Sequence, residues 1–123
     1  MSHISKVKVL VFDISALRAA AQKMGFQLLE NASPRAYSPQ PTANYVVRLP
    51  GRYDVGVRKA KVGYTLEADY YTGDVERHVG KGCGLLLQCY SAEVLRKQAA
   101  SKSMRYSESQ LPDGSLQCIL QEL

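Results

Sequence analysis

The sequence predicts an α+β fold: a single antiparallel sheet with two helices packed on one of its faces. Segments that alternate apolar and polar residues, typical of half-buried strands, occur along the whole chain. Only two segments carry apolar residues at helical spacing. With 123 residues, 46% of them apolar and 22% charged, the chain has the size and composition of one globular domain spanning residues 1–123.

The first elements are a strand, a helix and a second strand. Lys6–Phe12 alternates lysine with valine and predicts a half-buried strand. A helix follows, with Asp13 or Ser15 as its N-cap and Gly25 just past its end. Its apolar positions have helical spacing: Leu17, Ala20, Ala21 and Met24. Phe26–Glu30 is the second short strand.

A long loop and an antiparallel meander come next. Residues 31–43 contain three prolines and predict a loop. Three strands follow, at Asn44–Leu49, Tyr53–Lys59 and Val62–Asp69. Pro50–Gly51 and a pair near Ala60–Lys61 supply the turns between them.

The last elements are a polar connection, a helix and a hairpin. Tyr70–Gly84 is polar and rich in glycine, and Leu85–Lys102 predicts the second helix. Met104–Gln110 and Ser115–Gln121 form a hairpin across the strong turn signal of 111–114. The predicted order is therefore β-α-β-β-β-β-α-β-β.

The bulk composition predicts a cytoplasmic protein. No segment approaches the roughly 18–20 apolar residues needed to cross a bilayer. Lys6 and Lys8 interrupt any signal-peptide core, so we expect no membrane association. The three cysteines lack CxxC spacing and are expected to be reduced thiols.

Catalytic and metal-binding patterns are weak, and we expect neither an enzyme nor a bound cofactor or metal. His3 and His78 are the only histidines, and neither lies in a recognisable motif. Asp69, Asp74 and Glu76 are close enough in sequence for paired-carboxylate chemistry, and with His78 they leave a small hydrolase open. The alternative is the solvated rim of a loop.

The positive charge is concentrated in one third of the chain. Residues 31–66 hold six basic residues and one acid, so this segment carries a net charge of +5, the same as the whole chain. The parity of the strands directs Arg48 and Arg58 away from the helices. An electropositive sheet face can bind phosphates, and its candidate residues are Arg48, Arg52, Arg58, Lys59 and Lys61. The alternative is a solvated sheet face.

Two further motifs precede the second helix. Gly80 and Gly82 flank Lys81, and with Arg77 they predict a seat for a phosphate group at a helix start. The alternative is a flexible linker. Tyr70 and Tyr71 follow the meander and are candidate partner contacts, with packing over the sheet edge as the alternative.

Several of these segments together resemble a known family. They are Met-Ser-His-Ile-Ser at the start, Tyr53-Asp54-Val55-Gly56, Asp69-Tyr70-Tyr71 and the Asp113-Gly114-Ser115-Leu116 turn. Their order and spacing are similar to the uncharacterised family of a hypothetical plastid reading frame, domain of unknown function twelve-fifty-seven, with relatives in plastids, cyanobacteria, other bacteria and phages. The resemblance implies a single cytoplasmic α+β domain and carries over no catalytic residues. The Tyr70-Tyr71 pair and the Gly80–Gly84 segment depart from the family pattern.

These observations favour a small non-catalytic binding domain for an anionic partner, either nucleic acid or a phosphorylated small molecule. The alternative is an accessory or adaptor subunit, of phage or host, which docks on a larger protein machine through edge strands and Tyr70 and Tyr71. A homodimer through an uncovered sheet face is also open, although the positive charge on that face would oppose it.

Overall fold

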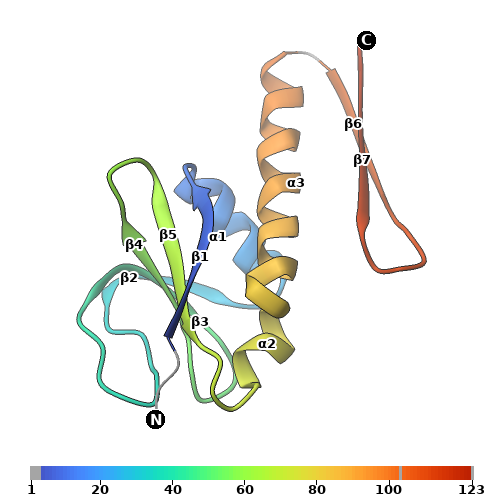
Figure 1. Ribbon diagram of the computed structural model, residues 1–123. Coiled ribbons are helices and arrows are strands. Elements are labelled where there is room, and N and C mark those ends of the chain that lie inside the picture. Colours follow the sequence, from blue (N-terminus) through green and yellow to red (C-terminus); the bar gives the residue numbers. More distant parts are fainter. Residues whose placement is uncertain (1–3, 103, 123) are drawn as a thin grey trace.

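The structure is a computed structural model that describes residues 4–102 and 104–122. It confirms the α+β class, and the strands and long helices follow the predicted order (Figure 1). The strands are β1 (Ile4–Val11), β2 (Gln27–Ala32), β3 (Ala43–Arg48), β4 (Val55–Lys59), β5 (Tyr64–Asp69), β6 (Met104–Gln110) and β7 (Leu116–Glu122). The helices are α1 (Ile14–Lys23), α2 (Asp74–Val79), the 3₁₀ turn η1 (Lys81–Cys83) and α3 (Gly84–Ser101).

The strands form two antiparallel sheets where the sequence predicted one. The larger sheet has the order β1-β5-β4-β3-β2, and β6 and β7 form a separate hairpin. The prediction of one sheet is wrong on this point because the hairpin packs along α3, which stands between it and the larger sheet (Figure 1).

The core lies between the larger sheet and helices α1 and α3. Asp13 caps α1 as predicted, with its Oδ1 accepting a hydrogen bond from Ala16 N at 3.0 Å. Gly25 ends the helix with a φ of +86°, a conformation that glycine adopts without strain. Strand and helix side chains then fill the interior, and its largest fully buried members include Leu17, Val47, Val57, Leu66 and Leu86.

The predicted polar connection between β5 and α3 contains the short helix α2. Val75 and Val79 lie four residues apart and are both fully buried, so one side of α2 closes the core. Gly73 and Gly80 bound this helix with positive φ angles. The flanking glycines favoured a loop in the sequence, whereas the burial of two valines stabilises a helical turn.

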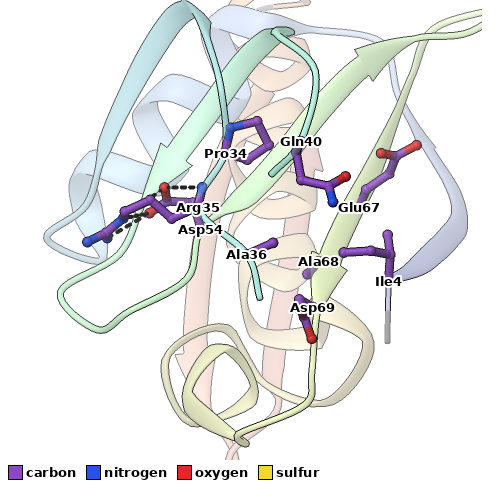
Figure 2. Close-up of a pocket in the computed structure, with 9 residues that line it drawn as sticks. All are labelled: Ile4, Pro34, Arg35, Ala36, Gln40, Asp54, Glu67, Ala68 and Asp69. Atoms are coloured by element: carbon purple, nitrogen blue, oxygen red, sulfur yellow. Dashed lines mark hydrogen bonds and ion pairs between the residues drawn. The ribbon is translucent and has the colours of Figure 1, made fainter. Parts of the chain in front are cut away.

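The loop of residues 33–42 covers the face of the sheet that is turned away from the helices (Figure 2). Pro34 is buried there, and a Cβ built on Gly56 would lie 3.2 Å from Pro34 Cγ. Val46, whose neighbours Tyr45 and Val47 belong to the helix side, is fully buried. Loop 33–42 therefore covers part of the sheet face that is turned away from the helices.

Within the described residues, no helix combines the length and the apolar character needed to cross a membrane.

Candidate functional site

A buried carboxylate holds the covering loop in place. The side chain of Asp54 is fully buried and accepts hydrogen bonds from Arg35 N at 2.9 Å and Arg35 Nη2 at 2.8 Å (Figure 2). It also accepts one from Leu49 N at 3.2 Å, and Arg48 Nε forms an ion pair with it at 3.3 Å. The carboxylate raises the pKa of the Arg35 guanidinium through these hydrogen bonds. Asp54 thus joins the loop to the turn after β3.

A second arginine fastens the far end of the loop. Arg58 Nε pairs with Glu67 Oε2 at 2.8 Å, and its other nitrogens donate to Thr42 O at 2.9 Å and Pro41 O at 2.8 Å. Arg48 and Arg58 are therefore engaged in intramolecular contacts. The prediction that they form an open basic face is wrong, because loop 33–42 covers Arg58 and both arginines are paired with carboxylates, although the side chain of Arg48 stays 39% exposed.

A second buried carboxylate, Asp69, lies beside the loop. Its Oδ2 accepts from Tyr37 N at 2.9 Å and its Oδ1 from Tyr71 N at 3.0 Å. The cavity between the loop and the strands has a volume of about 10 Å³ and is lined by Asp54, Asp69 and seven other residues (Figure 2). This volume suits at most about one water molecule, so the buried acids do not form a substrate pocket.

The residues proposed for a hydrolase site, Asp69, Asp74 and His78, each contact different partners in the structure. Asp74 Oδ2 accepts from Arg52 N at 3.0 Å, and this hydrogen bond lowers the pKa of Asp74. Asp69 holds the two tyrosine amides, while the His78 ring packs edge-on against Phe26 with 6.2 Å between ring centroids. In the described part of the chain, no group of three or more His, Cys, Asp or Glu side chains is arranged to hold a metal ion.

The other cations predicted on the sheet face, Arg52, Lys59 and Lys61, are exposed, but they lie in two places. Lys59 and Lys61 flank the turn at the end of β4, where Lys59 Nζ lies 6.0 Å from the centroid of the Tyr64 ring. Arg52 lies before the start of β4, and its backbone amide donates to Asp74. Arg77 forms an ion pair with the same carboxylate, with 3.6 Å between Arg77 Nη2 and Asp74 Oδ1. The exposed cations of the predicted electropositive face therefore lie at opposite ends of β4.

The glycine-rich segment packs tightly against the start of α3. A Cβ on Gly80 would lie 2.9 Å from Leu85 N, so close packing explains this glycine. Gly82 and Lys81 are exposed in η1. Cys83 is fully buried, its Sγ lies 3.2 Å from Tyr70 Oη, and burial raises the pKa of both groups.

Of the two predicted partner tyrosines, only Tyr71 presents much of its surface. Tyr70 packs against the core, whereas Tyr71 is 51% exposed. The Tyr71 ring lies 5.6 Å from that of Tyr37, which is also exposed. The structure thus places an aromatic pair where the sequence indicated two adjacent tyrosines.

An apolar groove on α3 was not predicted. Phe12 and Val62 are 62% and 61% exposed, the two most exposed of the large apolar side chains that the structure describes. Beside Phe12 lies a groove of about 370 Å³ along one side of α3. Its lining residues are Phe12, Tyr90, Ser91, Val94, Leu95 and Gln98, and we call it the α3 groove.

The walls of the α3 groove are held by hydrogen bonds. Tyr90 Oη accepts from Phe12 N at 2.9 Å and from Asp13 N at 3.1 Å, which ties the end of β1 to the helix. On the other side, a Cβ on Gly63 would lie 3.1 Å from the Phe12 ring, so the β4–β5 turn packs against it. One feature of the sequence indicates that Phe12 is exposed: strand alternation directs Val11 into the core and Phe12 outward.

Comparisons of this chain with protein-family models, with curated proteins and with solved structures find no match. The family resemblance stated above therefore stays a hypothesis.

Proposed function

We propose that this protein is a non-catalytic interaction module, an accessory subunit that docks on a partner protein through the α3 groove. The observation that carries this proposal is the exposure of Phe12, which lines a concave, mainly apolar surface. Val62 is almost as exposed and precedes Gly63 on the turn that packs against the Phe12 ring. Exposed apolar surface beside a groove is typical of protein-binding sites, since contact with a partner removes it from water.

The dimensions of the groove favour a helical partner segment. The lining residues run along α3 from Tyr90 to Gln98, which spans about 12 Å at the rise of an α-helix. This length accommodates about two turns of an amphipathic helix, with apolar side chains three or four residues apart facing the groove.

Charge at the rim favours an acidic segment. Asp13 and Lys97 neutralise each other, with 2.6 Å between Asp13 Oδ2 and Lys97 Nζ. Lys59 and Lys61 lie on the turn that packs against Phe12 and are exposed. We therefore expect a partner helix whose apolar positions are flanked by Asp or Glu, because charge complementarity guides such docking.

Binding of a nucleic acid or a phosphorylated small molecule is the second candidate function. It is favoured by the exposed cations that take no part in holding the loop: Arg52, Lys59, Lys61, Arg77 and Lys81. Neutralising phosphates with these side chains would make affinity fall steeply with salt, whereas apolar docking would depend on salt only weakly.

The test is photo-crosslinking in cells from the β4–β5 turn, which packs against Phe12 beside the α3 groove. A photoreactive amino acid replaces Val62, and in a matched control it replaces Tyr37, which is similarly exposed on another surface. We expect one protein to be crosslinked from position 62, through an apolar segment with acidic neighbours, and the crosslink to be lost with Phe12→Ser. A crosslink that persists in Phe12→Ser, or none, would refute the proposal. Nucleic acid crosslinked from position 62 would instead support the second candidate.

A further inference from the structure

The hairpin of β6 and β7 forms a sheet of two strands that is separate from the larger sheet. Its strands pair without a register shift from Met104↔Glu122 to Gln110↔Leu116. Two-stranded sheets are marginally stable in water unless they pack against another element. The element available here is α3, so the contacts between the hairpin and this helix decide how the strands are oriented.

The contacts between the hairpin and α3 are made mainly by β6. The Arg96 guanidinium lies 5.4 Å from the centroid of the Tyr106 ring, and Arg96 Nη2 lies 3.6 Å from Glu108 Oε2. Lys23 of α1 also reaches Glu108, at 3.8 Å. These charged and aromatic contacts all involve β6, which lies closer to α3 than β7 does. In the described residues β7 pairs with β6 alone, so its other edge has no strand beside it.

The outer edge of β7 lacks the features that protect strand edges. Natural edge strands avoid unwanted pairing through charge, proline, bulges or short length. The outer strand β2 has such protection: Arg18 Nη1 donates to Leu28 O at 3.1 Å, which places a charged side chain at this edge. The pairing of the other outer strand, β1, is interrupted by a register shift between Val7 and Val11.

By contrast, β7 is seven residues long and is uncharged from Leu116 to Gln121. It contains no proline, and its pairing has no bulge. Ile119 and Leu120 are 40% and 36% exposed. A long, regular, apolar edge of this kind is a template for pairing with another strand.

The sequence of β7 is complementary to itself in antiparallel pairing. With a two-fold axis at Ile119, that residue meets its own copy, Gln117 meets Gln121, and Cys118 meets Leu120. No like charges are brought together, and the two amide pairs can hydrogen-bond across the strands. A two-fold interface of this type uses the same edge twice and closes on itself.

We propose that two copies of this chain associate through β7, so that their hairpins form one four-stranded antiparallel sheet. Leu116, Cys118 and Leu120 lie on the hairpin face that carries Tyr106 and Glu108, because directly paired residues share a face. In the dimer this face continues across both copies, with an α3 helix on the same side at each end. A sheet of four strands is also more stable in water than a hairpin of two strands, which is marginally stable by itself.

The test uses opposite charges at position 119. The full chain, Ile119→Lys and Ile119→Glu are each measured by sedimentation over a concentration series. We expect the unaltered chain to dimerise and each variant to dissociate at least about tenfold more readily, since like charges would face each other at the axis. An equimolar mixture of the two variants should form a heterodimer.

The matched control is Ser107→Lys, which adds the same charge on the same face of the hairpin, at the position paired with Ile119 but on the inner strand β6. It should leave dimerisation nearly unchanged, and its circular dichroism spectrum checks that a lysine on this face is tolerated. The proposal is overturned if the unaltered chain is monomeric throughout. It is also overturned if its dimer survives both substitutions at position 119, or if the mixed variants fail to pair.

Discussion

Replacing Asp54 with Asn should destabilise the fold strongly without touching the α3 groove. The carboxylate is fully buried and accepts hydrogen bonds from Arg35 and Leu49, with Arg48 at 3.3 Å. Asn would remove the charge and leave two guanidinium groups facing a neutral amide. Removal of one partner from a buried ion pair typically costs about 3–5 kcal/mol.

The lower end of this range is expected. The side chains of Arg35 and Arg48 are 40% and 39% exposed, so water can solvate part of their charge once the carboxylate is gone. We therefore expect a loss of about 3 kcal/mol. A loss of this size lowers the midpoint of thermal unfolding by roughly 10 °C for a chain of this length.

Urea unfolding followed by far-ultraviolet circular dichroism measures this change. The midpoint should fall while the slope of the unfolding free energy against urea stays the same, because the fold is retained. Glu67→Gln is the matched control: it breaks the pair with Arg58, which keeps its two carbonyl contacts, so we expect a loss of only about 1 kcal/mol.

A double-mutant cycle assigns the loss to the ion pair. In an Arg35→Met background, Asp54→Asn should cost at least about 1 kcal/mol less, since its main charged partner is absent. The reasoning would be refuted if Asp54→Asn cost no more than Glu67→Gln, or if its cost were the same with and without Arg35.

Four further substitutions test other contacts, each by urea unfolding. The hydrogen bond with Lys97 lowers the pKa of Asp13 to about 2, from 3.8, so its stabilising effect is full above pH 4 and is lost as the pH falls to about 2. Asp13→Asn still caps α1, and it should lower the free energy of unfolding by about 1 kcal/mol at pH 7 and by progressively less below pH 4. A loss that stays the same from pH 7 to below pH 4 would contradict this. Tyr90→Phe should cost about 1–3 kcal/mol, because the amides of Phe12 and Asp13 lose their acceptor, and a neutral result would show that water replaces it. Gly51→Ala should destabilise, since its Cβ would lie 2.5 Å from Asp74 Oδ2 and would displace the carboxylate from its hydrogen bond with Arg52 N. Gly84→Ala, with open space and helical angles, should stabilise by about 0.5–1 kcal/mol, and the opposite signs would refute this reasoning.

The elements that the sequence predicted well depend on neighbours in the chain. Asp13 caps α1 because its carboxylate reaches an amide three residues away, and Gly25 ends the helix through its own backbone freedom. The closing hairpin follows from the turn at 111–114, where Asp113 Oδ1 accepts from Ser115 N at 3.0 Å. The strand alternation of β3, β4 and β5 likewise concerns residues two apart.

The elements that the sequence predicted poorly depend on distant partners. Strand parity correctly directed Arg48 and Arg58 away from the helices. It did not indicate that loop 33–42 would lie over Arg58, or that Arg48 would share Asp54 with Arg35 of that loop. Nothing in the spacing of these residues indicates which carboxylate an arginine will reach across 6 to 19 positions. The same holds for α2, whose two valines are buried by contacts with the rest of the core.

The sequence by itself therefore determined the α+β class, the order of the strands and long helices, and the turns between them, because hydrophobic periodicity and turn chemistry act over a few residues. Tertiary structure alone decided that the predicted basic face is partly covered and its arginines paired with carboxylates, that the hairpin stands apart from the sheet on α3, and that Phe12 borders a groove. These features arise from contacts between segments far apart in the chain, and only the folded arrangement specifies which of those segments meet.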